Sequence, residues 1–210
     1  MNLDCAKVNR DPFMIRDDVT EFLKKNDFDI INMCETDFGS TREAEDFSID
    51  GYKTHASKPN DRTGKVRLVV LIKNEVTKYC RIIGDDGSGY FPALFVDVKY
   101  HKSQPYILGG CYREWGAGSE KSIGEQLQRL NHLEDKIESL RRRYGGELWI
   151  GGDFNLNAQR FDDGTWDLKK VADRLMEICE KHSLKRLDAG PTYNYTKNEV
   201  VKSSTLDYFL

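Results

Sequence analysis

The apolar residues of this 210-residue chain switch repeatedly between the spacing of a strand and that of a helix. Four short apolar runs, at 66–72, 78–83, 93–100 and 105–112, follow one another without a helical segment between them. Residues 119–143 then carry apolar side chains at steps of three and four, which predicts one long amphipathic helix. Neighbouring strands followed by a long helix favour an α/β fold in which helices cover packed sheets.

The rest of the chain extends this pattern. We predict a helix around 15–25, a buried strand over 28–34 that ends at Glu35, and a second amphipathic helix around 168–178. Residues 37–64 are polar and turn-rich, so we expect a loop with room for one short strand. Further short strands are expected at 148–150, 184–187, 192–196 and 204–210.

These elements together predict the fold class. Strand pairs without intervening helices favour two packed mixed or antiparallel sheets flanked by helices, a four-layer α/β sandwich, over a doubly wound parallel sheet. No internal repeat, linker or low-complexity tract divides the sequence. We therefore expect a single domain over residues 1–210.

Composition excludes several classes of protein. No apolar run approaches the roughly 20 residues of a membrane span, and the N-terminus lacks the apolar core of a secretion signal. The five cysteines are scattered and form no Cys-x-x-Cys pair, so we expect no zinc site and a reducing, intracellular compartment. The net charge of −3 argues against strong sequence-independent DNA binding, yet a bound divalent cation could supply positive charge in a nuclease.

The most informative polar segment is Gly151-Gly152-Asp153-Phe154-Asn155, which follows a short apolar run. Glycines allow a sharp turn and a close approach of the backbone to a ligand. In an extended segment, Asp153 and Asn155 would point to one side and Phe154 into the core. A carboxylate beside a carboxamide can accept a proton from water and donate to an anion, which suits hydrolysis of a phosphate ester. An ordinary strand-to-loop turn is the alternative.

Three further polar residues lie at the ends of predicted strands. Glu35 closes a buried strand, where a carboxylate needs a partner such as a hard cation. Tyr112 ends another strand, and Asp207 lies within the apolar, aromatic end of the chain. Each has a simpler interpretation: an exposed glutamate, a packing tyrosine or a turn-capping aspartate.

Taken in chain order, these motifs resemble those of the endonuclease/exonuclease/phosphatase superfamily. The late Leu-Asp-Tyr-Phe-Leu segment is similar to that of apurinic/apyrimidinic endonucleases. Tyr-Arg-Glu-Trp, the long helix over 119–143 and Gly-Pro-Thr at 190–192 look most like the endonuclease domains of non-LTR retrotransposons. The resemblance covers almost the whole chain and implies a Mg²⁺-dependent phosphodiesterase, with Mn²⁺ as an alternative, that nicks DNA to prime reverse transcription.

The resemblance also implies a role for each matching residue. Glu35 would bind Mg²⁺, and Asp153 would orient or deprotonate the attacking water. Asn155 would hold a phosphate oxygen, and Tyr112 would contact the phosphate in the transition state. Asp207 would orient a histidine. Charge neutralisation and alignment, which such a site supplies, are what displacement at phosphorus needs most.

An asparagine near the N-terminus completes the family's site, and Asn2 is the first candidate, with Asn9 second. The family's last motif, Ser-Asp-His, does not follow Asp207. We therefore expect a domain that is incomplete at both ends and weak or inactive as a hydrolase, either a fragment of a longer polyprotein or a decayed copy.

The four histidines lie upstream of Asp207, at His55, His101, His132 and His182. His132 and His182 fall on predicted helices, where they are expected to face solvent rather than to replace the missing catalytic histidine.

Other residues are candidates for DNA contact. Single basic residues in loops, Arg113, Lys58 and Arg62, are better candidates than the basic run at the end of the long helix, because a helix end favours basic residues anyway. Trp115 or Trp166 could stack on bases, and packing is an equal alternative for each.

Two other functions compete with the nuclease. A phosphatase of the same superfamily would act on a phosphorylated inositol or sphingolipid headgroup. A non-catalytic remnant or DNA-binding module would keep the fold without turnover. The expected partners are DNA and a downstream reverse transcriptase domain, with no membrane, and the expected location is the nucleus.

Overall fold

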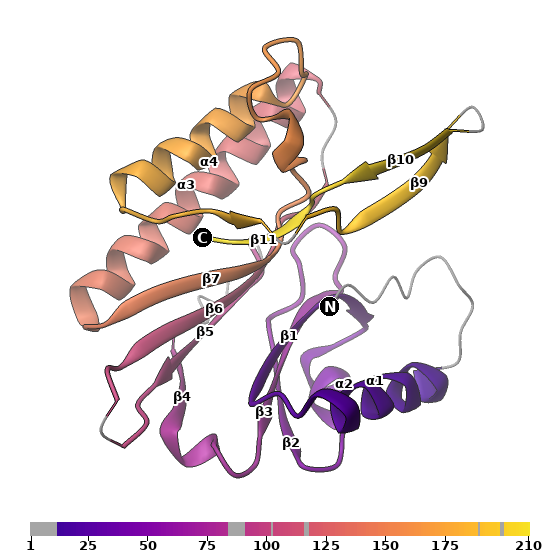
Figure 1. The fold of residues 1–210 in the computed structure, drawn as a ribbon, viewed down its shortest axis with the longest axis vertical. Helices are drawn as coiled ribbons and strands as arrows, with labels where there is room; N and C mark the ends of the chain where they lie inside the picture. The colour runs from indigo at the N-terminus through magenta and orange to yellow at the C-terminus, as the bar shows by residue number, and fades with distance from the viewer. Residues whose placement is uncertain (1–11, 84–90, 102, 116–117, 189, 198–199) are drawn as a thin grey trace.

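The computed structural model describes residues 12–83, 91–101, 103–115, 118–188, 190–197 and 200–210. Two sheets pack face to face in the middle, and helices cover the outer face of each (Figure 1). This arrangement confirms the four-layer α/β sandwich predicted from the sequence. None of the helices in the described part of the chain combines the length and apolar character needed to cross a bilayer.

The smaller sheet has the antiparallel order β1-β3-β2. Its strands are β1 (Ile30–Phe38), β3 (Val66–Lys73) and β2 (Tyr52–Ala56). The helices α1 (Pro12–Asn26) and α2 (Thr41–Asp46) cover its outer face.

The larger sheet has the order β4-β5-β6-β7-β11-β8 and is mixed, because β6 and β7 run parallel while their neighbours pair antiparallel. Its strands are β4 (Cys80–Ile83), β5 (Ala93–Val98), β6 (Tyr106–Tyr112), β7 (Glu147–Asp153), β11 (Asp207–Phe209) and β8 (Leu187–Asp188). The helices α3 (Glu120–Arg143) and α4 (Lys169–Lys181) cover it, and β9 (Tyr193–Lys197) with β10 (Val200–Ser204) forms a separate hairpin that projects from the body.

Three apolar clusters fill the three interfaces between the four layers. One lies between α3, α4 and the larger sheet, one between α1, α2 and the smaller sheet, and one between the two sheets. The helix α3 supplies the first with Leu130, Leu133 and Ile137, all fully buried, and burial of each such side chain contributes about 1.5–3 kcal/mol. The predicted apolar stripe of this helix is therefore the surface that docks onto the sheet.

Several predicted boundaries were wrong. The strand predicted at 28–34 runs from Ile30 to Phe38, so Glu35 lies within β1 and not at its end. The segment 78–83 begins as a short 3-10 helix (Thr77–Tyr79) before β4, and 204–210 contains the end of β10 and then β11. Of the strand predicted at 184–187, only Leu187 is in a strand.

The region 37–64, predicted as loop with one strand, contains β2 and also the helix α2. Ser40 caps this helix, because its side chain accepts the Glu43 backbone N–H at 3.1 Å. Glu43 in turn accepts the Gly39 backbone N–H at 2.8 Å. The Ser-x-x-Glu pattern that forms such a cap is visible in the sequence, but the helix is too short to show an apolar period.

Candidate active site at one end of the sandwich

Three polar residues lie side by side across three strands of the larger sheet. The strand register pairs Tyr112 of β6 with Asp153 of β7, and Asp153 with Asp207 of β11. Partners in adjacent strands point to the same face of a sheet, so these side chains form one polar row. The row faces the smaller sheet, because Tyr112 belongs to the cluster between the two sheets.

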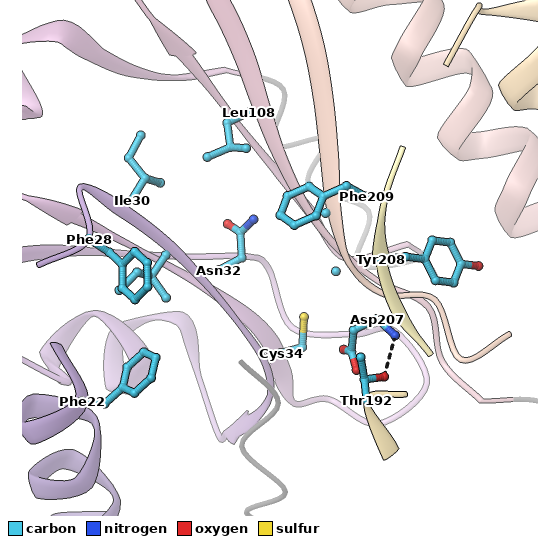
Figure 2. A pocket seen from close by; sticks show the side chains of 13 residues that line it. Phe22, Phe28, Ile30, Asn32, Cys34, Leu108, Thr192, Asp207, Tyr208 and Phe209 are labelled. Carbon is cyan, nitrogen blue, oxygen red and sulfur yellow. Dashed lines mark hydrogen bonds between the residues drawn. The ribbon is translucent and has the colours of Figure 1, made fainter. Parts of the chain in front are cut away.

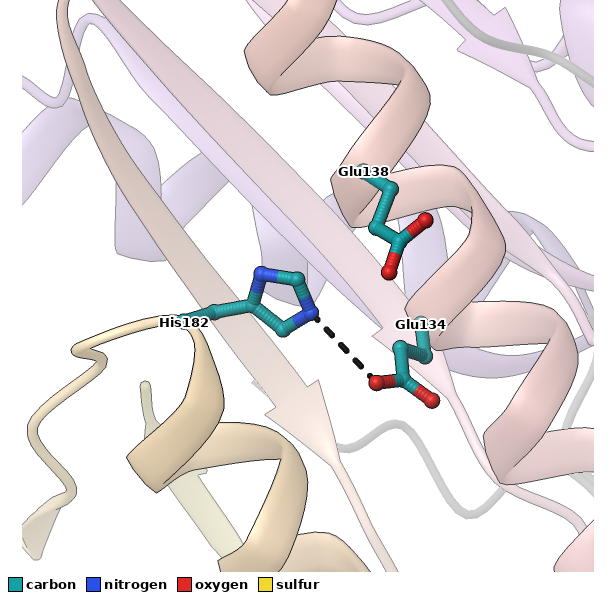
Figure 3. A group of neighbouring side chains, drawn as sticks. All are labelled: Glu134, Glu138 and His182. Atoms are coloured by element: carbon teal, nitrogen blue, oxygen red, sulfur yellow. Dashed lines mark ion pairs between the residues drawn. The ribbon is translucent and has the colours of Figure 1, made fainter.

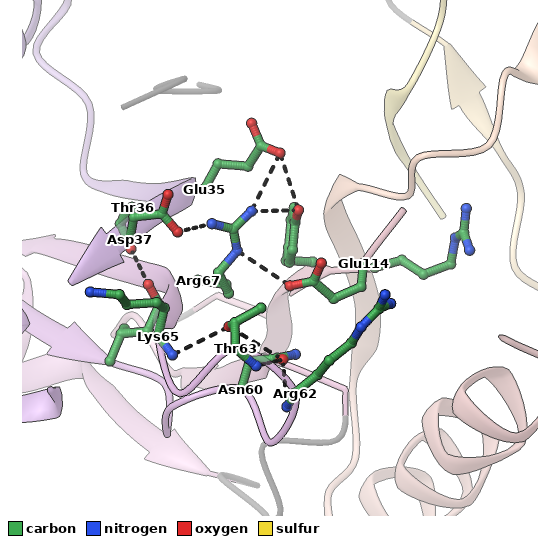
Figure 4. A network of polar contacts seen from close by, with 12 residues as sticks. Glu35, Thr36, Asp37, Asn60, Arg62, Thr63, Lys65, Arg67 and Glu114 are labelled. Atoms are coloured by element: carbon green, nitrogen blue, oxygen red, sulfur yellow. Dashed lines mark hydrogen bonds and ion pairs between the residues drawn. The ribbon is translucent and has the colours of Figure 1, made fainter. Parts of the chain in front are cut away.

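The smaller sheet adds Glu35 to this row through a bulge in β1. Cys34 pairs with Leu68 and Phe38 with Val66, so three residues of β1 lie opposite Arg67 alone. Glu35 and Asp37 both adopt positive φ, at 57° and 56°, a conformation that costs non-glycine residues about 1–3 kcal/mol each. Bulges of this kind commonly re-aim side chains at active sites. Here the bulge directs Glu35 and Asp37 towards Arg67 (Figure 4).

Arg67 forms the centre of a polar cluster that sequence reasoning missed. Its guanidinium pairs with Asp37, lies 3.5 Å from Glu35 Oε1 and 3.4 Å from Glu114 Oε1, and donates to Tyr112 Oη at 2.7 Å. Tyr112 Oη in turn donates to Glu35 Oε1 at 3.1 Å. We call these five residues the Arg67 cluster. A charged residue within the apolar run Val66-Arg67-Leu68 was the available signal, but its partners are distant in sequence.

The glycines before Asp153 allow β7 to lie close to its neighbours. A side chain at Gly152 would collide with the Cys111 backbone, and one at Gly151 would collide with the Phe209 ring. After them, Phe154 is fully buried and stacks on Tyr208 with ring centroids 4.5 Å apart. The prediction that Phe154 points into the core is confirmed.

Asn155 does not lie in an extended segment, contrary to the prediction that it shares one side of a strand with Asp153. The strand β7 ends at Asp153, and Asn155 has a φ of 49°. Its backbone N–H donates to Asp153 Oδ1 at 2.8 Å, and its side-chain amide donates to the Arg113 carbonyl at 2.8 Å. Asn155 therefore holds the turn and orients the Asp153 carboxylate.

Arg113 follows the end of β6, as a loop residue, but the prediction that it contacts DNA was wrong. The side chain is completely buried and donates to the carbonyls of Phe154 and Asn155 and to Gln126 Oε1. The reason is strand alternation: Tyr112 faces the smaller sheet, so the next residue faces the helices. Burial lowers the pKa of the Arg113 guanidinium to about 10.

The remaining candidates are divided between surface and core. Lys58 and Arg62 are exposed in the segment before β3, and Trp115, three residues after Tyr112, is 64% exposed. Trp166 packs against the helix-side core beside Phe161. Asn2 and Asn9 lie outside the described residues.

Electrostatics single out Asp153 within the polar row. Its side chain is 1% exposed, and burial, together with the nearby charges of Asp207 and Glu35, raises its pKa to about 8. Burial also raises the pKa of Asp207. Carboxylates that raise one another's pKa favour a bound cation, and Mg²⁺ typically uses one or two carboxylates plus water. The hard oxygen donors of Glu35 and its neighbours fit such a cation.

A cavity of about 370 Å³ borders this row between β1, β7 and β11 (Figure 2). Its walls are mostly apolar, with Phe22, Phe28, Ile30 and Phe209 among them. At one end it reaches Asp207, whose backbone N–H donates to Thr192 Oγ1 at 3.2 Å. The polar row therefore adjoins an apolar hollow on its β11 side.

A second acidic group lies between α3 and the end of α4. Glu134, Glu138 and His182 have ligand atoms within 4.8 Å of one another, close enough to hold a metal ion (Figure 3). Lys181 Nζ, however, lies 2.8 Å from a carboxylate oxygen of each glutamate, and Arg174 also pairs with Glu134. We call these five residues the helix cluster, and its own cations already neutralise its carboxylates.

His182 was expected to face solvent on a helix, and this was wrong. It caps the end of α4 and is only 8% exposed, with Nε2 3.6 Å from Glu134 Oε1. The contact joins residues far apart in the chain, so helical spacing gives no sign of it.

Comparison with solved structures identifies the fold. The endonuclease domain of TRAS1, a telomere-specific non-LTR retrotransposon, is 15% identical with a TM-score of 0.62, covering 100% of this chain and 81% of that one. The AP endonuclease LMAP from Leishmania major is 16% identical with a TM-score of 0.70, covering 99% and 76%. The mannosyl-6-phosphatase Bt3783 from Bacteroides thetaiotaomicron is 12% identical with a TM-score of 0.62, covering 94% and 76%.

Sequence comparison finds less than structure. No protein-family model matches this chain, and no curated protein sequence matches it significantly. At identities of 11–16%, the structural likeness establishes the arrangement of strands and helices and not the activity. The two packed sheets, their flanking helices and these structural neighbours show that the chain has the endonuclease/exonuclease/phosphatase fold.

Proposed function

We propose that this chain is a divalent-cation-dependent phosphodiester hydrolase that nicks DNA. One observation carries the proposal: Tyr112, Asp153 and Asp207 form a row across three neighbouring strands, and Glu35 reaches that row from the opposite sheet. Such convergence of carboxylates and a phenol suits alignment and charge neutralisation at a phosphate. The solved structures of the same fold include a retrotransposon endonuclease and an AP endonuclease.

In this mechanism Glu35 would hold Mg²⁺, or Mn²⁺ in its place, and the bound cation would neutralise charge on the scissile phosphate. A bound cation would favour the ionised form of Asp153, which would accept the proton of the attacking water while the water oxygen bonds to phosphorus and the P–O bond to the leaving DNA oxygen breaks. The Asn155 backbone N–H orients the Asp153 carboxylate. The Tyr112 hydroxyl, which donates a hydrogen bond to Glu35 in this structure, would donate to a phosphate oxygen when DNA is bound. Asp207 lies beside Asp153 on the neighbouring strand, and the Asn155 side chain would hold a phosphate oxygen.

DNA is the proposed partner, and the exposed side chains near the site suit it. Lys58 and Arg62 offer positive charge before β3, and Trp115, three residues after Tyr112, offers an exposed aromatic face. A reverse transcriptase domain in a longer polyprotein, acting in the nucleus, is the context that we propose for the nick.

Nicking of supercoiled plasmid tests the proposal. Wild-type protein should convert supercoiled to open-circular DNA with Mg²⁺ or Mn²⁺ and lose this activity with EDTA. Asp153→Ala should reduce the rate about 100-fold or more, since general-base groups contribute about 10²–10⁴-fold. Lys78→Ala, a surface change on the 3-10 helix before β4, serves as the control. Equal nicking by the Asp153→Ala protein would show that a contaminant is responsible.

Two alternatives have specific support. A solved phosphatase shares the fold, so release of inorganic phosphate from a phosphorylated inositol or lipid, without nicking, would favour that activity. The Arg67 guanidinium already lies against Glu35, so a non-catalytic DNA-binding module is the other alternative. DNA retention in a gel-shift assay without any nicking would favour it.

A further inference from the structure

The Arg67 cluster contains three acidic side chains and one basic side chain, which is partly buried. Arg67 contributes one positive charge, and Glu35, Asp37 and Glu114 contribute three negative ones. The Arg67 side chain is 12% exposed, so water screens these charges less than it screens surface pairs. Arg67 therefore neutralises only part of the negative charge around Glu35.

Arg67 also connects the two sheets. It lies on β3 of the smaller sheet, and its NH2 group donates to Tyr112 Oη on β6 of the larger sheet at 2.7 Å. The guanidinium carbon lies 4.7 Å from the centre of the Tyr112 ring. Since Tyr112 donates onward to Glu35, one planar fork orients both the phenol and the carboxylate of the candidate site.

We propose that Arg67 is a positioning residue that holds Glu35 and Tyr112 in place for the phosphoester and weakens the affinity of the site for a divalent cation. The inference has two parts. The positioning half, that Arg67 holds Glu35 and Tyr112 for catalysis, rests on the proposed function. The metal half, that Arg67 weakens cation binding at Glu35 and its neighbours, can be measured without substrate. The two effects of removing Arg67 should therefore have opposite signs: tighter metal binding and slower turnover.

The metal half is tested by Mn²⁺ titration, with free Mn²⁺ followed by electron paramagnetic resonance. Arg67→Met should lower the Mn²⁺ dissociation constant about tenfold, because loss of a positive charge next to Glu35 removes a repulsion of that order. Arg67→Lys keeps the charge and should stay near the wild-type value. Arg81→Met is the matched control, since Arg81 pairs with a buried Asp97 on the larger sheet, apart from the Arg67 cluster.

The positioning half is tested by plasmid nicking at saturating Mn²⁺. Arg67→Met and Arg67→Lys should both lower kcat about tenfold with little change in KM, because neither side chain can pair with Asp37 and Tyr112 together. Arg81→Met should nick at the wild-type rate. Circular dichroism and thermal melts establish that each variant is folded.

The inference is overturned if folded Arg67→Met protein binds Mn²⁺ as weakly as, or more weakly than, the wild type. It is also overturned if neither protein binds Mn²⁺ at millimolar concentration, or if both variants keep the wild-type kcat. A purely structural Arg67 would lower the melting temperature without tightening Mn²⁺. By contrast, tighter Mn²⁺ binding without nicking by any protein would leave the metal half standing and refute the proposed hydrolase.

Discussion

The Arg67 cluster and the helix cluster both surround glutamates with basic residues, yet they differ in backbone and in charge. Glu35 and Asp37 lie in a bulge at positive φ, whereas Glu134 and Glu138 lie on a regular helix, four residues apart. Arg67 faces three carboxylates, whereas Glu134 and Glu138 share Lys181, and Glu134 also pairs with Arg174.

This difference supports the proposal that the Arg67 cluster, and not the helix cluster, belongs to a reactive site. Strained backbone persists only where the surroundings hold it in place, and it gathers at functional sites. An excess of partly buried carboxylates over basic side chains favours binding of a cation. The helix cluster has neither feature, although its ligand atoms are the more compact group. Compactness alone is therefore a poor guide to a metal site.

The largest expected difference between the clusters is in catalysis. Glu35→Gln should reduce plasmid nicking about 100-fold or more, because it removes the charged ligand proposed for Mg²⁺. Glu134→Gln, the same chemical change in the helix cluster, should leave the rate within twofold or so. Rates from matched plasmid assays check both, and a severe loss in Glu134→Gln with an intact fold would reverse the comparison.

The next difference is in the pH dependence of stability without metal, between Asp153, in the polar row that adjoins the Arg67 cluster, and Glu134 of the helix cluster. The folded pKa of Asp153 is raised to about 8. Its contribution to the free energy of unfolding is therefore fully present below the unfolded pKa of about 4 and is lost as pH rises through 8. The change should be on the order of a few kcal/mol. Asp153→Asn should flatten this decline in urea unfolding between pH 5 and 8, and an unchanged decline would contradict the assignment.

Glu134 should contribute a pH dependence of stability of the opposite sign. Its ion pairs with Lys181 and Arg174 lower its pKa, so its contribution is present above the unfolded pKa and is lost as pH falls through the lower folded value. Glu134→Gln should therefore lower the free energy of unfolding at neutral pH and have no effect on it in acid. Urea unfolding at pH 7 and at pH 3 distinguishes these cases, provided that the chain remains folded at the lower pH.

Metal binding should then stabilise the folded chain through one cluster only. At 100 times the dissociation constant, a cation that binds only the folded state adds about 2.7 kcal/mol. The melting temperature of wild type and of Glu134→Gln should rise with Mn²⁺, and that of Glu35→Gln should not. If Mn²⁺ instead fails to raise the melting temperature of Glu134→Gln but still raises that of Glu35→Gln, the metal site lies in the helix cluster.

The smallest effect is expected from the helix cluster itself. Glu134→Gln should cost about 1 kcal/mol or less at pH 7, as partly exposed ion pairs usually do. Salt should reduce this cost, because it screens the pairs with Lys181 and Arg174. Equilibrium unfolding at 0.05 M and 0.5 M NaCl would measure it, and a loss of several kcal/mol would show a more buried network than the structure has.

The sequence by itself determined the layers and singled out the residues of the polar row, Glu35, Tyr112, Asp153 and Asp207. The apolar period of α3 and the short runs of the strands report local burial, which each segment shows on its own. The motif at Gly151–Asn155 and the late Leu-Asp-Tyr-Phe-Leu segment located Asp153 and Asp207. From the sequence, their proximity followed only from the resemblance. The structure places them side by side, because β11 pairs with β7 in a register that matches the two aspartates.

Only the tertiary structure decided what surrounds Glu35. Arg67 meets Asp37 across 30 residues and Tyr112 across 45, and Tyr112 meets Glu35 across 77. Such contacts depend on the β1 bulge, which moves two side chains to one face and has no periodic signature. The burial of Arg113 likewise depends on which face of β6 the helices cover. Spacing along a chain indicates which face of a strand or helix a residue lies on, whereas the packing of the layers decides which residues it contacts.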